Sequence, residues 1–287
     1  MHVRTLCFAA ALVSTTYAHG DDRQTQVRAA LTSGGEAVRL TVTNGGKQPK
    51  VELAGAKRKV TLYDGEAAAT IEAGHGRVLI AVAVDAVNKP FQILTLDGGK
   101  LAAPIALARG NDRADVPFAV VATATPTGFT VFFQEVEAEN ANEAHTYMAL
   151  LDKTGAVTEE PREIQVPWAL AAAAWNGKGY HLALFYTGGG DGVRLSMVSL
   201  SEAGAPQQHP DWASAPGLVS DVHLVASGGA IRAFYRGGMG DRLLETDVTK
   251  IGQWGQVKTK AKDHGALART QAIALTAKGA ATKVKAK

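Results

Sequence analysis

Short apolar runs, each ended by a glycine-containing turn, recur along most of this chain. Residues 38–42 (VRLTV) alternate apolar and polar side chains, which is the period of a strand with one buried face. Residues 78–84 (VLIAVAV) are continuously apolar, as is typical of a strand buried on both faces. Asn44-Gly45 is a strong hairpin signal because both residues tolerate a positive φ. The pattern predicts an all-β protein built from many short strands.

The apolar runs repeat with a period near 50 residues. Residues 116–119 (VPFA) match residues 166–169 (VPWA) at an offset of 50, and residues 185–189 (FYTGG) match residues 234–238 (FYRGG) at an offset of 49. Four short strands per repeat, with about five repeats, are typical of propeller blades. The chain accordingly resembles the broad β-propeller class across residues 27–255, without the motifs of a named subfamily. A glycine precedes the second strand of each repeat, at Gly35, Gly76, Gly128, Gly179 and Gly229.

The fold prediction is therefore an all-β propeller of about five blades. Tandem β-sandwiches are the alternative, because they also contain short strands at regular spacing. The first repeat is the least regular and is expected to form either a blade or a small accessory sheet. The alanine-rich residues 169–174 are expected to let neighbouring sheets approach closely near the axis. Residues 264–276 are expected to form a strand that completes the first blade, or a short helix.

The N-terminus has the features of a secretory signal in their usual order. Residues 1–18 contain a positive start, a short apolar run and small residues before a cleavage point after Ala18. The only cysteine, Cys7, lies within this segment, so the mature chain would have no disulfide and no thiolate ligand. Residues 19–26 are polar and expected to be flexible, and no later segment is apolar enough to span a membrane. These features predict a periplasmic or extracellular protein.

Charge is divided unevenly between the body of the chain and its C-terminal tail. Residues 256–287 carry seven Lys, one Arg and one Asp, a net charge of +7, whereas residues 19–255 carry 21 basic and 26 acidic side chains, a net charge of −5. The tail is expected either to contact anionic envelope polymers or only to keep the chain solvated. Its last residues, 278–287, are expected to be disordered, and no specific nucleic-acid binding is expected.

Motifs of the common enzyme classes are absent from the sequence. It contains no G-x-S-x-G elbow, no P-loop and no H-E-x-x-H helix. Asp191 and Asp241 occupy comparable turns of adjacent repeats and could bind a cation or sugar hydroxyls, although aspartate also favours turns for its own backbone conformation. The candidate binding residues are the charged side chains of these turns and of an acidic insertion, namely Asp191, Asp241, Arg236, Glu135, Glu137 and Glu139.

The acidic insertion, residues 135–143, carries its first three glutamates at alternate positions. On an extended strand, Glu135, Glu137 and Glu139 would lie on one side, where a bound cation would relieve their repulsion. A solvated hairpin tip is the alternative interpretation. No cofactor is assigned from the sequence, and calcium and copper both stay open.

His19 supplies the hypothesis for copper. Cleavage after Ala18 would make His19 the first residue, and an N-terminal histidine can chelate copper through its amine and ring nitrogen. In this one residue the chain is similar to lytic polysaccharide monooxygenases and to some periplasmic copper carriers. A second histidine would have to approach it, and His75, His145, His181, His209, His223 and His264 are the candidates.

The function predicted from the sequence is an exported, non-enzymatic propeller that binds a protein or glycan partner through loops on one face. The alternative from another class is a propeller-based glycan hydrolase or lyase, with acid and base supplied by loop carboxylates. A copper-binding protein that uses His19 is the remote alternative.

Overall fold

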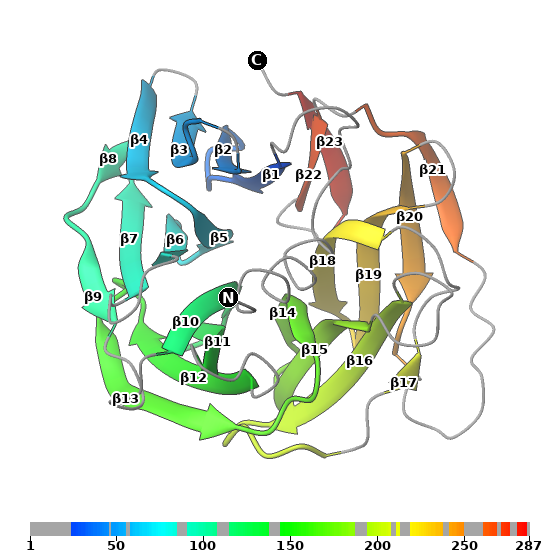
Figure 1. The fold of residues 1–287 in the computed structure, drawn as a ribbon. Helices are drawn as coiled ribbons and strands as arrows, with labels where there is room; N and C mark the ends of the chain where they lie inside the picture. The colour runs from blue at the N-terminus through cyan, green and yellow to red at the C-terminus, as the bar shows by residue number, and fades with distance from the viewer. Residues whose placement is uncertain are drawn as a thin grey trace.

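The computed structural model describes residues 24–45, 47–55, 58–84, 91–107, 115–137, 144–186, 194–207, 211–212, 219–237, 241–249, 261–268, 271–275 and 280–285. Within these ranges every regular secondary-structure element is a β-strand. Five antiparallel sheets surround a central axis, each with its first strand innermost (Figure 1). This is a five-blade propeller, so the prediction from the repeat pattern is confirmed and the tandem sandwiches are excluded.

The first three blades are consecutive antiparallel sheets in chain order. The first contains β1 (Gln24–Leu31), β2 (Ala37–Asn44), β3 (Lys50–Gly55) and β4 (Arg58–Asp64). The second contains β5 (Ala67–Gly74), β6 (Arg77–Val84), β7 (Phe91–Asp97), β8 (Lys100–Leu101) and β9 (Ile105–Leu107), the last two both pairing with β7. The third contains β10 (Asp115–Ala124), β11 (Gly128–Glu137), β12 (Ala144–Asp152) and β13 (Val157–Ile164).

The last two blades follow the same order, and a separate hairpin comes after them. The fourth blade contains β14 (Ala169–Trp175), β15 (Gly179–Tyr186), β16 (Arg194–Ser201) and β17 (Asp211–Trp212). The fifth contains β18 (Val219–Ser227), β19 (Ala230–Gly237), β20 (Arg242–Asp247) and β21 (Lys262–Ala266). The hairpin, called here the C-terminal hairpin, consists of β22 (Gln271–Leu275) and β23 (Ala281–Lys285).

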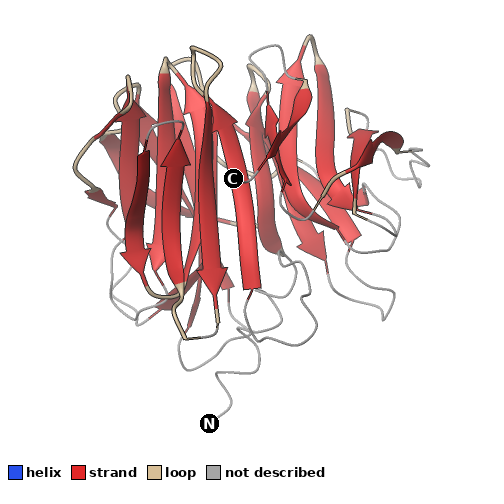
Figure 2. Ribbon diagram, turned by 90° about the horizontal axis from the view of Figure 1, so that it is seen from above, coloured by secondary structure: helices blue, strands red, loops and turns tan. Residues whose placement is uncertain are grey.

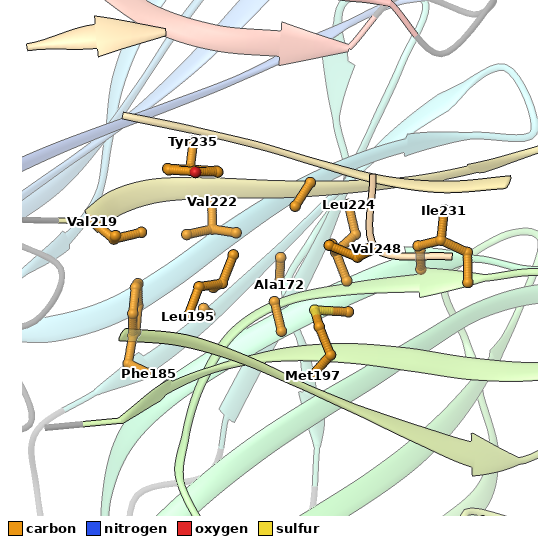
Figure 3. Close-up of a cluster of buried hydrophobic side chains, with 14 residues drawn as sticks. Ala172, Phe185, Leu195, Met197, Val219, Val222, Leu224, Ile231, Tyr235 and Val248 are labelled. Carbon is orange, nitrogen blue, oxygen red and sulfur yellow. The ribbon is translucent and has the colours of Figure 1, made fainter. Parts of the chain in front are cut away.

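Apolar side chains fill the spaces between neighbouring blades. Separate clusters of buried side chains join the first blade to the second, the second to the third, the third to the fourth and the fourth to the fifth. Figure 3 shows the last of these, in which Phe185 and Met197 of the fourth blade face Val222 and Tyr235 of the fifth. Each blade is thus buried on both faces, which explains why runs such as residues 78–84 contain no polar residue.

The alanine-rich strand β14 has the position expected of it. Ala171, Ala172 and Ala174 are buried against the fifth blade, while Leu170 and Ala173 pack toward the third. Methyl side chains on the innermost strand let two neighbouring sheets come close together, where the blades converge on the axis.

The tail departs from its prediction. Residues 264–276 form neither one closing strand nor a helix, because residues 262–266 are the outer strand of the fifth blade and residues 271–275 begin the C-terminal hairpin. The hairpin lies between the fifth and first blades (Figure 1). There Ala272 and Ala274 pack on Ala29 of β1, and Ile273 packs on the fifth blade.

Both ends of the chain carry more strand than the polar composition suggested. Residues 278–287, expected to be disordered, contain strand β23, and β1 begins at Gln24, within the stretch expected to be flexible. The first repeat is a full blade. The expected signal segment, residues 1–18, lies outside the described residues.

The strands run along the propeller axis, between two ends of the molecule (Figure 2). The end at which the inner strands β1, β5, β10, β14 and β18 begin is called here the leading end. The inner strands finish at the opposite end, in tight turns such as residues 32–36 and 75–76. Among the described residues, no helix is long and apolar enough to cross a membrane.

Candidate functional site

The inner strand of the fifth blade, β18, is interrupted near the leading end by a β-bulge. Ser220 pairs with Arg236 and His223 with Phe234, so β18 contains one residue more than its partner between these two pairs. Asp221 lies in the bulge with a φ of 49°, in the left-handed region. Bulges re-aim side chains, and a non-glycine residue in this region carries strain of about 1 kcal/mol or more. Strain of this kind makes Asp221 a candidate functional residue.

Asp221 and His223 form a dyad at this bulge. The Oδ1 atom of Asp221 lies 3.0 Å from Nε2 of His223, and the two side chains are only 9% and 11% exposed. Since a carboxylate can only accept, Nε2–H of His223 donates, and the neutral ring carries its free lone pair on Nδ1. The Nδ1 atom makes no hydrogen bond to any described residue. The dyad therefore has the form of an oriented general base.

The C-terminal hairpin supplies the second contact of Asp221. The backbone N–H of Ile273 donates to Oδ2 of Asp221 at 3.2 Å. Arg236 of β19 holds the segment that leads into this hairpin, by donating to the carbonyl oxygens of Leu267 at 2.9 Å and Gln271 at 2.7 Å. The tail thus fixes the orientation of the dyad.

Arg28, on the inner strand β1, is the third charged residue of this region. Its Nε atom is completely buried and has no hydrogen-bond partner among the described residues. Burial lowers the pKa of Arg28, and the nearby Asp221 carboxylate opposes part of that shift. Asp221, His223 and Arg28 are called here the axial cluster. It combines an oriented base with a guanidinium whose buried Nε has no acceptor among the described residues.

Glu72 is the other perturbed carboxyl group on an inner strand, but it lies near the opposite end of the axis. It is two residues from the end of β5, and its carboxylate accepts a hydrogen bond from the backbone N–H of Ala124 on β10. Burial raises the pKa of Glu72 to about 8, and this hydrogen bond opposes the shift. Glu72 is therefore mostly a neutral acid at pH 7 and belongs to the contact between the second and third blades.

A serine–histidine pair in the fourth blade is not an activated nucleophile. Nδ1 of His181 lies 2.9 Å from Oγ of Ser199, and its Nε2 lies 2.7 Å from Nδ2 of Asn176. The amide of Asn176 is oriented by its Oδ1, which accepts from the N–H groups of Lys178 and Gly179. Nδ2 therefore donates to Nε2, so Nδ1 carries the proton and donates to Ser199. A histidine that donates to the serine hydroxyl cannot remove the hydroxyl proton. In addition, burial lowers the pKa of His181.

The candidate residues from the fifth-blade turn have structural contacts. Arg236 is 6% exposed and donates hydrogen bonds to the carbonyl groups of the tail. Asp241 has a φ of 50°, and its Oδ1 lies 3.7 Å from Arg236. Its backbone oxygen accepts from Leu267 at 2.7 Å, so this turn also holds the tail.

The acidic insertion begins inside the third blade. Glu135 is completely buried on β11, on the face that carries Phe133, so it is not part of a solvated hairpin tip. Glu137 is the last residue of β11, at the leading end. The chain order places Glu135, Glu137 and Asp241 at the same end of the propeller as the axial cluster. Asp191, Glu139 and His19 lie outside the described residues.

The axial cluster was not predicted from the sequence, where His223 was considered only as a second ligand for copper. An Asp-x-His spacing at the start of a strand was the available signal, because it places two side chains on one face. Nothing in the sequence indicated that Arg28, almost 200 positions earlier, would lie beside them. No group of three or more histidine, cysteine or acidic residues that could hold a metal ion occurs among the described residues.

No protein-family model matches this chain, and no curated protein sequence matches it. Solved structures match its fold. An α-L-arabinanase of Penicillium chrysogenum, solved with arabinobiose, has a TM-score of 0.54 at 11% identity, over 83% of this chain and 80% of its own. A protein of unknown function from Dyadobacter fermentans has a TM-score of 0.56 at 9% identity, over 91% and 89%. An α-L-arabinofuranosidase of Clostridium thermocellum has a TM-score of 0.50 at 8% identity, over 83% and 92%. At these identities the likeness shows the propeller fold.

Proposed function

We propose that this chain is a propeller-based glycan hydrolase whose active site is the axial cluster at the leading end. The observation that carries the proposal is the Asp221–His223 dyad, which is held in strained backbone on an inner strand and has Nδ1 of His223 free to act as a base. Catalytic groups in propellers are well placed near the axis, because inner strands from several blades converge there.

The main prediction from the sequence, a non-enzymatic binding protein, is overturned by the comparison with solved structures. Several of the structures that share the fold are named as glycan-cleaving enzymes, including the arabinanase, the arabinofuranosidase and a xylan β-1,4-xylosidase of Bacillus halodurans. They support the alternative, a glycan hydrolase. The source of the base differs from that alternative, because it comes from a strand bulge and not from loop carboxylates.

Hydrolysis at this site would use the dyad to activate water. Nδ1 of His223 takes a proton from water as the oxygen attacks the anomeric carbon, and Asp221 stabilises the imidazolium that forms. The departing sugar oxygen needs a proton from an acid on the other side of the bond.

The test is cleavage of a panel of purified glycans (arabinan, xylan and polygalacturonan), measured as new reducing ends. The native chain should cleave at least one of them, and His223→Gln and Asp221→Asn should each lower the rate by about 100-fold or more. Asparagine at position 221 tolerates the left-handed backbone, so this variant should still fold.

His181→Gln is the matched control, because it removes a histidine that is hydrogen-bonded within the fourth blade. It should retain the native rate. The proposal fails if the native chain cleaves no glycan of the panel, or if His223→Gln is as active as the native chain.

Arg28 favours a second candidate, a glycan lyase. A guanidinium beside a base can neutralise a sugar carboxylate, which makes the neighbouring C5–H acidic enough for His223 to remove. The electron pair then forms a C4–C5 double bond as the C4–O bond breaks, and the leaving oxygen takes a proton. The product distinguishes the two reactions, since elimination leaves an unsaturated sugar that absorbs ultraviolet light and hydrolysis does not.

We also propose that the chain is exported, with cleavage after Ala18. A positive start, an apolar run and small residues in the order of a signal peptide support this proposal. Expression of the full chain with a secretion-competent host should yield a mature protein that begins at His19 by mass spectrometry. Recovery of an uncleaved chain would contradict it.

A further inference from the structure

The C-terminal hairpin occupies the place of a blade but contains only two strands. One of its faces packs on the fifth blade, where Ile273 joins a cluster with Phe234, and the other packs on the first blade, where Ala272 joins a cluster with Ala29. Its first strand, β22, contacts the inner strands β1 and β18, as the innermost strand of a blade would. The five blades contain four or five strands each. The described part of the chain thus supplies no third strand to this sheet.

The outer edge of β23 has no strand beside it among the described residues. Its residues, Ala281–Lys285, pair with β22 alone and are half-buried or exposed. Lys283 donates to the carbonyl oxygen of Ala266 on β21 at 2.7 Å, and Arg39 donates to that of Lys285 at 2.6 Å. These side-chain contacts hold β23 in place without adding a strand to its edge. An edge of this kind presents N–H and C=O groups with which another extended chain can pair.

The face of the first blade that looks toward the hairpin is polar beyond its inner strand. Ala29 packs on the hairpin, and cross-strand pairing places Arg39 and then Lys59 outward from it on the same face. The cations of this face outnumber its acids, the five charged residues being Arg39, Lys50, Lys59, Glu52 and Asp64. The first blade therefore borders the hairpin with an excess of positive charge.

The hairpin adds to this positive charge. Its strands carry Lys283 and Lys285 and contain no acidic residue. On the fifth-blade side, Glu245 is already paired with Arg232 and His264, at 3.4 and 2.6 Å. Antiparallel pairing of β23 with a second copy of itself would bring the lysines of the two chains together, and like charges across a strand pair are destabilising. The charge around β23 therefore suits an acidic strand and opposes self-pairing.

We propose that the outer edge of β23 is a docking site for an extended acidic segment of another protein, which adds a third strand to the C-terminal hairpin. Main-chain hydrogen bonds along the edge give affinity, and carboxylates beside the lysines give selectivity. A peptide fits this edge better than an anionic glycan, because a strand edge pairs with alternating N–H and C=O groups. The site is distinct from the dyad proposed for catalysis, since Asp221 contacts β22.

The test measures binding of a fluorescent peptide of alternating threonine and glutamate to the full chain, by anisotropy. Two peptides of the same length serve for comparison. One carries lysine in place of glutamate, and the other keeps the glutamates but has methylated backbone nitrogens, which cannot donate to a strand edge. The acidic peptide should bind about 10-fold or more tightly than either. The inference is overturned if the acidic peptide does not bind, or if the methylated peptide binds equally well.

Polygalacturonate is a further arm of the same experiment, because it carries carboxylates without peptide groups. If it displaces the acidic peptide and binds more tightly, the surface is specific for anionic glycans and the docking of a strand is refuted. Polygalacturonate that displaces the peptide only weakly supports strand addition.

Hydrogen exchange and one substitution locate the contact. Bound acidic peptide should slow exchange in residues 281–285 and leave β13, in the third blade, unchanged. Lys285→Glu reverses a charge at an exposed position of β23 and should lower the peptide affinity by about 10-fold or more. Lys178→Glu is the matched control, since that lysine is exposed in a turn of the fourth blade, and it should keep the native affinity.

Two results would contradict this location. One is native peptide affinity in Lys285→Glu, and the other is unchanged exchange in residues 281–285 when the peptide is bound. The exchange measurement uses the native chain, so it decides even if the variant does not fold.

Discussion

The interface between the fourth and fifth blades and the junction between the fifth and first blades are closed in different ways. The first contains a large apolar cluster, with Phe185 and Met197 packed against Val222 and Tyr235. The second is filled by the C-terminal hairpin, and polar contacts attach it on both sides. Arg39 of the first blade donates to the carbonyl oxygen of Lys285 at 2.6 Å. Toward the fifth blade, Lys283 donates to Ala266 at 2.7 Å.

The difference explains where the axial cluster lies. At the interface between the fourth and fifth blades, apolar side chains from both blades fill the space. At the junction a two-stranded hairpin replaces a full blade, and side chains such as Arg236 and Asp221 satisfy its backbone groups. The polar groups that hold this hairpin in place are thus next to the dyad. The dyad therefore lies where the packing of blade on blade gives way to the C-terminal hairpin.

Breaking the regular interface should have the largest effect. Phe185→Ala removes a ring that is 5% exposed in the cluster between the fourth and fifth blades, and leaves a cavity. We expect the free energy of unfolding to fall by about 4 kcal/mol, measured by urea denaturation. Ile105→Ala, at an exposed position of β9, should cost less than about 1 kcal/mol. Equal losses in the two variants would mean that the interface is not tightly packed.

The hydrogen bonds from Arg236 to the tail are called here the clamp. Breaking the clamp should lower the free energy of unfolding by somewhat less, and its effect should be confined to the junction. Arg236→Met keeps the bulk of the side chain and leaves the carbonyl groups of Leu267 and Gln271 without their donors, so we expect a loss of about 3 kcal/mol. Hydrogen exchange should show faster exchange in β22 while the fourth blade stays protected. Arg242→Gln, which breaks a half-exposed pair with Asp263, should cost at most about 1 kcal/mol. Unchanged protection of β22 would show that the hairpin does not depend on the clamp.

The pH dependence of stability should report on Glu72, at a regular interface. Its pKa is raised to about 8 by burial, so between its ordinary value near 4.5 and pH 8 the folded state binds more protons than the unfolded state. Its contribution to stability is therefore present at acidic pH and lost as pH rises toward 8, by at most about 1.4 kcal/mol per pH unit.

Glu72→Gln keeps the side-chain oxygen that accepts from Ala124 and cannot ionise. Urea denaturation at pH 5 and pH 8 should therefore show a smaller decline in the variant than in the native chain. If both chains decline equally, another group carries the pH dependence.

The smallest expected effect concerns His181, which lies inside the regular fourth blade, whereas His223 lies at the junction. Asn176→Asp should place a carboxylate against Nε2 of His181 and raise the pKa of that histidine by about one unit. The direction is opposite to the present lowering by burial. An NMR titration of His181 measures the shift, and stability should change by less than about 1 kcal/mol. An unchanged pKa would mean that Asn176 does not contact Nε2 in solution.

Part of the fold followed directly from the spacing of glycines, although for two different physical reasons. Gly76 and Gly229 have φ values of 75° and 80°, which only glycine adopts without strain. At Gly128 and Gly179 the reason is space, because a Cβ atom would collide with the carbonyl oxygens of Leu151 and Leu200. Each blade has one of these two constraints at the corresponding glycine, so the repeat was readable before any contact was known.

The sequence by itself determined the all-β class, a repeat of about five units and the apolar character of the strands. These are set by local turn geometry and by the period of the side chains, which a single chain displays along its length. Only the tertiary structure decided how the ring closes, and that Arg236 donates to the carbonyl groups of the tail. It alone also placed Asp221, His223 and Arg28 together, because ring closure makes neighbours of residues from opposite ends of the chain. The C-terminal hairpin has no counterpart in the repeat, so the period of the chain does not predict it.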